Sequence, residues 1–272
     1  MGDLKEIASF DEPPVNETVL AVGFASLAGM GAAHFSRFQQ AHLPNYSEAE
    51  ELPAYNMPIE RLSGGNAGIS FALSQGIPPT RTAFVDPAGD RLFQIQRDWF
   101  GHNWRRTGDS QYPRYPDLKR SFLEGWKEFG DWAAGEAGRP PLEVAQAEVT
   151  YINHLPALEV DGKKTKAPAR LLRLFSVAQL GEGVQELESV NLSTSALFTD
   201  QNGLPVGRLH ISFGPSQTRE GDAVNILNLT ARGAPEMGLS KFFDAARAAI
   251  VTTFVQLTDT ELHTQWGRND DD

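Results

Sequence analysis

The second half of the chain repeats short β-rich runs separated by turn signals, and this pattern constrains the fold most. Asp161-Gly162 and Asn202-Gly203 favour tight hairpin turns, and glycines at 181–183 and 221 mark two more turns. The pattern predicts an antiparallel meander of five strands, at about residues 145–159, 168–178, 184–199, 205–214 and 223–231.

An amphipathic segment follows these strands and continues to about residue 264. Its apolar side chains recur with a helical period, at Leu239, Phe242, Phe243, Ala246, Ile250, Phe254 and Leu257. A helix with so wide an apolar face needs a large apolar surface to cover, and the preceding sheet is the nearest one. We therefore expect the meander to pack against a long C-terminal helix.

The first half predicts a lobe of strands and two helices. A β-rich run at 15–24 precedes a helix at about 28–41, and a loop is expected at 44–66. Two strands at 80–85 and 91–99, with Phe93, Ile95 and Trp99 on one face, precede a helix at about 116–134. Grouped strands with helices before and after them predict an α+β fold. We expect residues 1–140 and 141–272 to form two lobes of one compact unit.

Composition excludes several classes of site. The chain of 272 residues has no cysteine, so disulfides, thiolate metal sites and cysteine nucleophiles are ruled out. Neither a signal peptide nor a membrane-spanning stretch of about 20 apolar residues is visible, so we expect a cytoplasmic protein that does not enter membranes. The net charge of −11 disfavours binding to phosphate backbones.

Two basic islands interrupt this acidic chain. Residues 97–120 hold six basic and three acidic side chains, and residues 162–173 hold five basic side chains and no acidic one. The sequence does not show whether the two islands meet in one surface.

Motifs that would name a reaction are missing from the sequence. No histidine pair has metal-ligand spacing, and no G-x-S-x-G nucleophile elbow occurs. The run Gly162-Lys163-Lys164-Thr165 lacks the upstream glycine of a phosphate loop. We expect no catalytic residue, metal or cofactor, which favours a protein that is not an enzyme.

The segment from residue 96 to 115 is the most unusual, because it contains five aromatic residues and four arginines. Tryptophan, tyrosine and arginine are enriched among residues that anchor protein partners, and arginine also stacks on aromatic rings. The alternative is that both tryptophans belong to the core and the arginines pair with acidic groups. The candidate binding residues are Arg97, Trp99, Asn103, Trp104, Arg105, Tyr112, Arg114 and Tyr115.

A second candidate group lies on the strand that follows the helix at 116–134. Alternation along a strand places Tyr151 and Asn153 on one face, and Ile152 and His154 on the other. Tyr151, Asn153 and His154 are either ligand contacts or a hydrogen-bonded group that fixes a loop.

These residues carry a resemblance to a known family. The marks are Pro13-Pro14-Val15-x-Glu17, Asn103-Trp104-Arg105, Tyr112-Pro113-Arg114-Tyr115 and Tyr151-Ile152-Asn153, followed by a helix that ends near His263 and Trp266-Gly267. In these motifs the chain resembles a sporadically distributed, functionally uncharacterised bacterial family of about this length. The resemblance implies no reaction, cofactor or substrate, and its patchy distribution hints at an accessory role in defence or on mobile elements.

Three functions remain open on the sequence. The first is a recognition or assembly protein that binds a protein partner, or itself, through the segment 99–115. The second is a protein, or an enzyme, that binds a small ligand or nucleotide, with Arg97, Arg105, Tyr151, Asn153 and His154 lining a cavity. The third, binding of single-stranded nucleic acid by the basic islands, is disfavoured by the net charge.

Overall fold

The computed structural model describes residues 7–62, 80–138, 141–155, 158–160, 163–165, 172–173, 189–218 and 221–269. Its helices are α1 (Ala32–His42), α2 (Tyr115–Ala137), α4 (Leu239–Leu257) and α5 (Thr260–Gln265). Its strands are β1 (Ser9–Phe10), β2 (Val15–Phe24), β3 (Glu48–Pro53), β4 (Thr80–Val85), β5 (Arg91–Gln96), β6 (Trp99–Arg105), β7 (Val144–Leu155), β8 (Leu158–Val160), β9 (Lys163–Thr165), β10 (Leu192–Thr199), β11 (Pro205–Gln217), β12 (Ala223–Gly233) and β13 (Arg268–Asn269).

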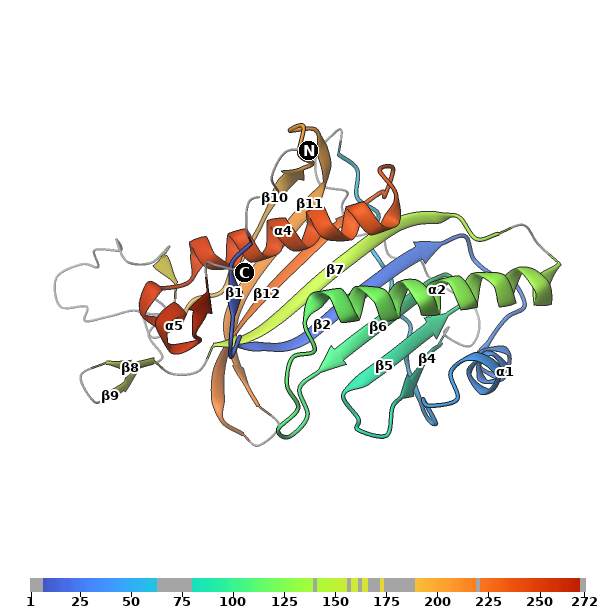
Figure 1. The fold of residues 1–272 in the computed structure, drawn as a ribbon, viewed down its shortest axis with the longest axis horizontal. Helices are drawn as coiled ribbons and strands as arrows, with labels where there is room; N and C mark the ends of the chain where they lie inside the picture. Colours follow the sequence, from blue (N-terminus) through green and yellow to red (C-terminus); the bar gives the residue numbers. More distant parts are fainter. Residues whose placement is uncertain are drawn as a thin grey trace.

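Nine of these strands form one antiparallel sheet in the order β10-β11-β12-β7-β2-β6-β5-β4-β3 (Figure 1). The long strands β2 and β7 pair at its centre and join the two halves of the chain. On either side of this pair, a three-stranded meander leads into a helix: β4-β5-β6 into α2, and β10-β11-β12 into α4. The α+β class expected from the sequence is confirmed, and a single sheet runs through both expected lobes.

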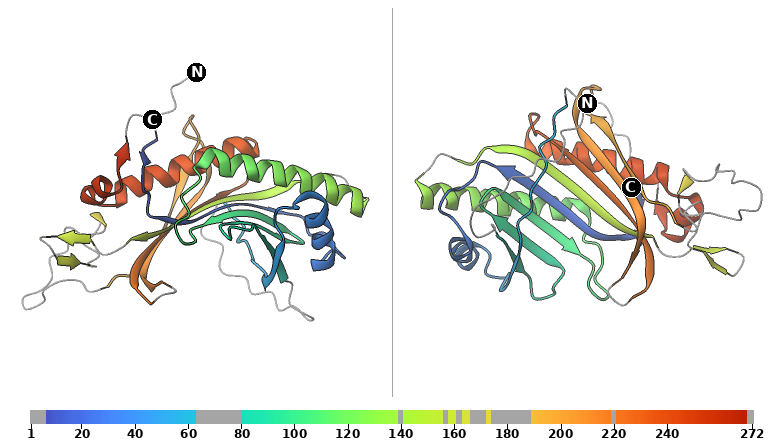
Figure 2. Two further views of the ribbon diagram at one scale, coloured as in Figure 1. Left: turned by 60° about the horizontal axis from the view of Figure 1, so that its bottom comes forward. Right: turned by 180° about the vertical axis from the view of Figure 1, so that it is seen from behind.

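Helices α2 and α4 lie on the same face of the sheet (Figures 1 and 2). The apolar stripe predicted for α4 is buried, including Phe242, Phe243 and Ile250. Phe122 of α2 meets Phe243 of α4 edge to face at 5.0 Å between ring centroids. The main core therefore lies between this face of the sheet and the two helices.

A segment of extended chain crosses the other face of the sheet. This segment, residues 54–61, is called the strap below; it follows β3 and passes in front of the central strands when the molecule is seen from behind (Figure 2, right). The main chain of Tyr55 bonds to the side chain of Gln96, and the amide of Glu60 donates to Gln146 at 2.7 Å. Glutamine side chains of the sheet thus supply the main-chain hydrogen bonds of the strap that a neighbouring strand would otherwise supply.

The C-terminal helix ends earlier than predicted. It stops at Leu257 because Thr258 is extended, and the hydroxyl of Thr258 donates to the carbonyl of Phe254. Asp259 then caps a separate short helix, since its side chain accepts from the amide of Glu261. Thr258 and Asp259 are start signals for a new helix, and they outweigh the continuous apolar period.

The predicted end of the strand at 91–99 is also wrong. Residues 97 and 98 form a two-residue turn, so β5 ends at Gln96 and Trp99 begins β6 opposite it. Trp99 therefore lies on the strap side of the sheet, whereas Phe93 and Ile95 belong to the core on the helix side.

The meander is described only in part. The turn at Asn202–Gly203 joins β10 to β11, as predicted. However, β7 ends at Leu155, and β8 and β9 pair in a separate two-stranded sheet. The predicted strand at 168–178 lies outside the described residues apart from Leu172 and Arg173. The loop expected at 44–66 contains edge strand β3, whose exposed Glu50 and Glu51 suit an unpaired edge.

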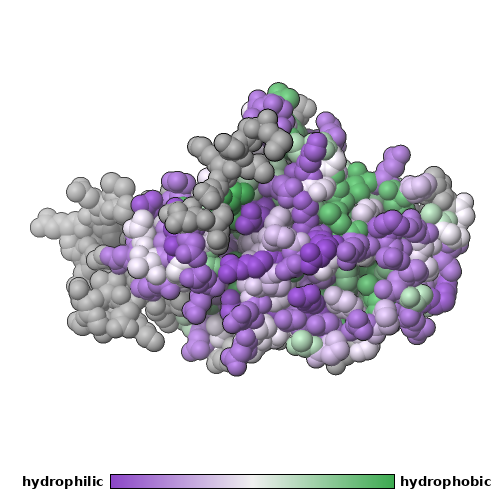
Figure 3. All heavy atoms as spheres, viewed as in Figure 1, coloured by the Kyte–Doolittle hydropathy of each residue, from purple (hydrophilic) through white to green (hydrophobic). Residues whose placement is uncertain are grey.

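The outer surface of the helices is mostly polar. In the space-filling view of the helix side, hydrophilic residues cover most of the surface and smaller hydrophobic areas lie between them (Figure 3). Within the described residues, no helix combines the length and apolar composition needed to span a bilayer.

Candidate functional site

A pocket of about 370 Å³ opens where β1, the start of α2, strand β7 and helix α4 meet. Its walls are largely apolar and come from segments far apart in the sequence. We call it the tyrosine pocket, after its three tyrosines. The apolar lining includes Phe10, Val15, Leu229, Ile250, Val251 and Phe254, and the polar lining includes Tyr112, Arg114, Tyr115, Tyr151, Asn153 and Arg247.

Local structure explains how these side chains converge. Tyr151 and Asn153 are two residues apart on β7, so both point to the helix side, as the alternation predicted. Arg247, Ile250 and Phe254 are spaced by three and four residues, so they share one side of α4.

Arg114 occupies a strained position at the entrance to α2. It is the one described residue other than glycine with a positive φ angle, 65°. Such a conformation costs on the order of 1–3 kcal/mol and persists only where the surroundings hold it. The Arg114 guanidinium donates to the carbonyl of Phe10 at 2.9 Å, which ties the start of α2 to β1.

The three tyrosines keep their protons. The hydroxyls of Tyr112 and Tyr151 lie 2.9 Å apart and share a hydrogen bond. The hydroxyl of Tyr115 donates to Asp244 at 3.1 Å. Burial raises the pKa of all three, and it is the largest cause in each case. The pocket therefore offers neutral hydroxyl groups, which donate as well as accept hydrogen bonds.

Arg247 supplies a positive charge inside this group. Its guanidinium lies 4.9 Å from the centroid of the Tyr115 ring. The same charge works against the rise in the pKa of Tyr112 and Tyr151, so it faces both hydroxyls. Among the described residues, no acidic side chain lies within ion-pair distance of Arg247 or Arg114.

A larger, more open hollow of about 1100 Å³ adjoins the tyrosine pocket. The two share Pro13, Pro14, Tyr112 and Arg114 as a common wall. His154 lines this outer hollow, because it faces away from Tyr151 and Asn153 on β7. Burial and the nearby charge of Arg106 lower the pKa of His154.

The structure divides the residues singled out in the sequence. Five of the eleven line the tyrosine pocket: Tyr112, Arg114, Tyr115, Tyr151 and Asn153. His154 lines the outer hollow, and neither hollow is lined by Arg97 or Arg105. Arg97 is exposed at the turn between β5 and β6, and Arg105 donates to the carbonyl of Gly89.

The tryptophans of the aromatic segment are buried. Trp104 is 0% exposed and packs in the core against Tyr112, with ring centroids 5.3 Å apart. Trp99 is 3% exposed and lies on the strap side against Tyr55. Asn103 is also buried and donates to Glu17 at 2.6 Å. These three side chains present almost no surface to a partner, so the tryptophans are core residues, as the alternative held. Among the described residues, the arginines do not pair with acidic groups as it also held, because Arg105 and Arg114 donate to main-chain carbonyls.

Arg247 and Phe10 are pocket residues that the sequence reading missed. Arg247 carried a usable signal, because it lies four residues after Phe243 and three before Ile250, beside the apolar stripe of the helix. Phe10 carried none. It reaches the pocket only because β1 pairs with β13 near the other end of the chain.

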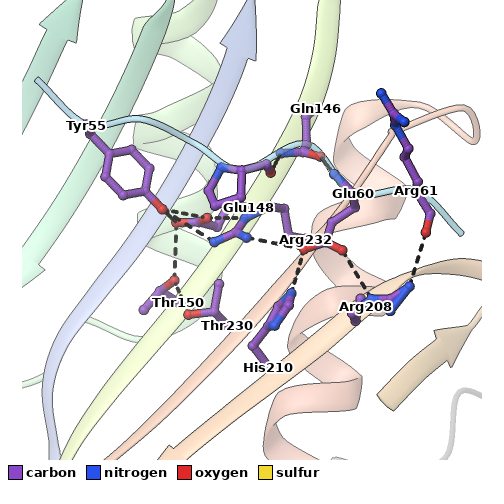
Figure 4. Close-up of polar contacts among 11 residues, drawn as sticks. Tyr55, Glu60, Arg61, Gln146, Glu148, Thr150, Arg208, His210, Thr230 and Arg232 are labelled. Atoms are coloured by element: carbon purple, nitrogen blue, oxygen red, sulfur yellow. Dashed lines mark hydrogen bonds and ion pairs between the residues drawn. The ribbon is translucent and has the colours of Figure 1, made fainter. Parts of the chain in front are cut away.

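A second polar group lies on the strap side of the sheet (Figure 4). Glu148 of β7 accepts from Arg232 of β12 at 2.6 Å and from the hydroxyl of Tyr55 at 3.0 Å. Glu60 of the strap pairs with Arg232 and Arg208, each at 3.2 Å. His210 contacts Glu60 at 2.5 Å. Each charge has a partner, so this network fixes the strap to the sheet.

Other kinds of site find little support. Within the described part of the chain, no group of three or more His, Asp or Glu side chains is arranged to hold a metal ion. Apart from Arg173, the side chains of the second basic island lie outside the described residues. Comparisons with family models, with curated proteins and with solved structures found no match.

Proposed function

We propose that this chain binds a small molecule in the tyrosine pocket. The observation that supports this most strongly is the pocket itself, with a volume of about 370 Å³, apolar walls and a few converging polar groups. Binding sites for small molecules typically measure roughly 300–1,000 Å³ and have this mixture of walls. The strained backbone of Arg114 lies at its edge, and such strain concentrates at functional sites.

Binding to a protein partner through the segment 99–115 stays a prediction. Its expected aromatic anchors, Trp99 and Trp104, are buried, which removes the main support for it. Tyr112, Arg114 and Tyr115 of the same segment line the pocket instead. We therefore favour the small-ligand hypothesis and assign no catalytic residue.

The test uses a neutral probe whose fluorescence rises in apolar surroundings, N-phenyl-1-naphthylamine, and a variant that fills the pocket. Val251 lines the pocket from α4, so Val251→Trp should block it. Val255 is the matched control: it lies one turn further along α4, is also half-buried, and is not part of the lining.

We expect the probe to bind the unaltered protein and Val255→Trp, and to lose most of its binding to Val251→Trp. Circular dichroism and the unfolding temperature verify that both variants are folded. Equal binding by all three proteins, or no binding by any, would overturn the proposed function.

A further inference from the structure

We propose that the ligand of the tyrosine pocket is an amphipathic anion, in which a singly charged oxyacid group binds Arg247 and an apolar body fills the rest. This inference rests on the proposed function and adds the chemical class of the ligand. A pocket for such a ligand has three features: a positive charge that the protein leaves uncompensated, hydrogen-bond donors that suit an oxyacid, and walls that suit an apolar body.

The charge balance of the pocket is the first argument. Arg114 and Arg247 contribute two positive charges, and none of the lining residues is acidic. The nearest carboxylate on α4, Asp244, is already bound by Lys119 at 2.7 Å and by the hydroxyl of Tyr115. Removing a charge from water is costly unless an opposite charge compensates it. An anionic ligand supplies that compensation for the half-buried Arg247.

The donors around Arg247 are the second argument. A guanidinium presents a planar fork that matches the two oxygens of a carboxylate or the oxygens of a sulfate. The Tyr115 ring supports one side of this fork. In the Tyr112–Tyr151 pair only one hydroxyl donates to the other, so one hydroxyl hydrogen is not used within the pair. Guanidinium and hydroxyl donors together favour an oxyacid over a neutral group.

The rest of the pocket accounts for the body of the ligand. Beyond Arg247, the side of α4 that lines it continues with Ile250, Val251 and Phe254, and Phe10 closes it from β1. Phe10 is itself held in place by edge-to-face packing on Phe254 at 5.7 Å. An alkyl chain or a small ring system gains from burial at about 25 cal/mol per Å² of apolar surface. A free inorganic anion would leave this volume unfilled.

The experiment compares three probes that each contain ten carbon atoms: decanoate, decyl sulfate and decan-1-ol. Dissociation constants are measured by isothermal titration calorimetry near neutral pH. The proteins are the unaltered chain, Arg247→Gln, Arg247→Lys and Lys241→Gln. Lys241 is the matched control, because it is exposed on α4 outside the pocket and its replacement removes the same charge.

We expect at least one anion to bind the unaltered protein roughly tenfold more tightly than the alcohol, since hydrogen bonds between charged groups are stronger than those to a neutral hydroxyl. Arg247→Gln should abolish this preference while decan-1-ol still binds, and Lys241→Gln should keep it. Arg247→Lys should retain part of it, because the charge remains without the planar fork. Which anion is preferred identifies the headgroup as a carboxylate or a sulfate.

Other outcomes separate the two proposals. If decan-1-ol binds as tightly as both anions, or if Arg247→Gln keeps the preference, the anion inference is wrong and the pocket still binds small molecules. If neither these probes nor the neutral naphthylamine bind, the proposed function itself fails. If Arg247→Gln does not fold, Arg247→Lys provides the comparison, and an unchanged preference in that variant overturns the inference.

Discussion

Replacing Glu148 by alanine should be among the most destabilising single changes on the strap side of the sheet. Glu148 is 4% exposed and bonds to Arg232 at 2.6 Å and to the hydroxyl of Tyr55 at 3.0 Å. Its loss leaves Arg232, which is 8% exposed, with the longer 3.2 Å contact to Glu60. Breaking a buried ion pair from one side costs about 3–5 kcal/mol, because the remaining charge is buried without adequate compensation.

The free energy of unfolding is measured by urea denaturation, followed in parallel by tryptophan fluorescence and circular dichroism so that a single transition can be verified. The matched control is Asp131→Ala on α2. It removes an ion pair to Lys127 in which both side chains are mostly exposed, and it should change stability little.

A double variant, Glu148→Leu with Arg232→Met, tests the reason behind this prediction. Because the double variant removes both charges together, it should lose less free energy of unfolding than Glu148→Leu and Arg232→Met lose in sum as single variants. The reasoning would be refuted if Glu148→Ala behaved like Asp131→Ala, or if the double variant were as destabilised as that sum.

Two further predictions concern the helix side of the molecule. Gly125→Ala should destabilise the fold by about 1–3 kcal/mol, because the added Cβ would lie 2.5 Å from the ring of Phe93. Gly130→Ala on the same helix has open space and should stabilise the fold by about 0.5–1 kcal/mol. Urea denaturation of both variants measures the sign of each change, and equal effects would contradict the packing described. Burial, aided by the charge of Arg91, lowers the pKa of His102 from 6.5 to about 3. Below pH 6.5 the unfolded chain therefore binds a proton that the folded chain excludes until about pH 3, so stability should fall by about 1.4 kcal/mol per pH unit as the pH is lowered through this window. His102→Gln should remove that part of the slope, and an unchanged slope would show that His102 does not titrate in this way.

Local patterns in the sequence predicted much of the secondary structure, because they depend on neighbouring residues. The alternation predicted that Tyr151 and Asn153 share one face of β7, and both line the tyrosine pocket. The apolar period from Leu239 predicted α4 and its buried side. These signals fail where one short feature interrupts a longer pattern, as the turn at residues 97 and 98 and the cap at Asp259 do.

Long-range pairing could not be predicted from the sequence. Nothing local indicates that β2 pairs with β7, or that β1 meets β13, yet these pairings make one sheet of two halves and bring Phe10 to the pocket. The aromatic and basic composition around residues 96–115 was likewise ambiguous, since it suits a core as well as a surface. The pairing of β6 places Trp104 in the core, and the segment before α2 brings Tyr112 and Arg114 to the pocket.

The most direct test of the tyrosine pocket as a binding site is a crystal structure of the chain grown with decanoate that carries bromine at its far end. Bromine can be located by its anomalous scattering. The account predicts a bromine peak inside the tyrosine pocket, near Phe10 and Phe254, with the carboxylate at Arg247. A saturated crystal with the bromine bound elsewhere, and with the pocket free of the probe, would contradict it.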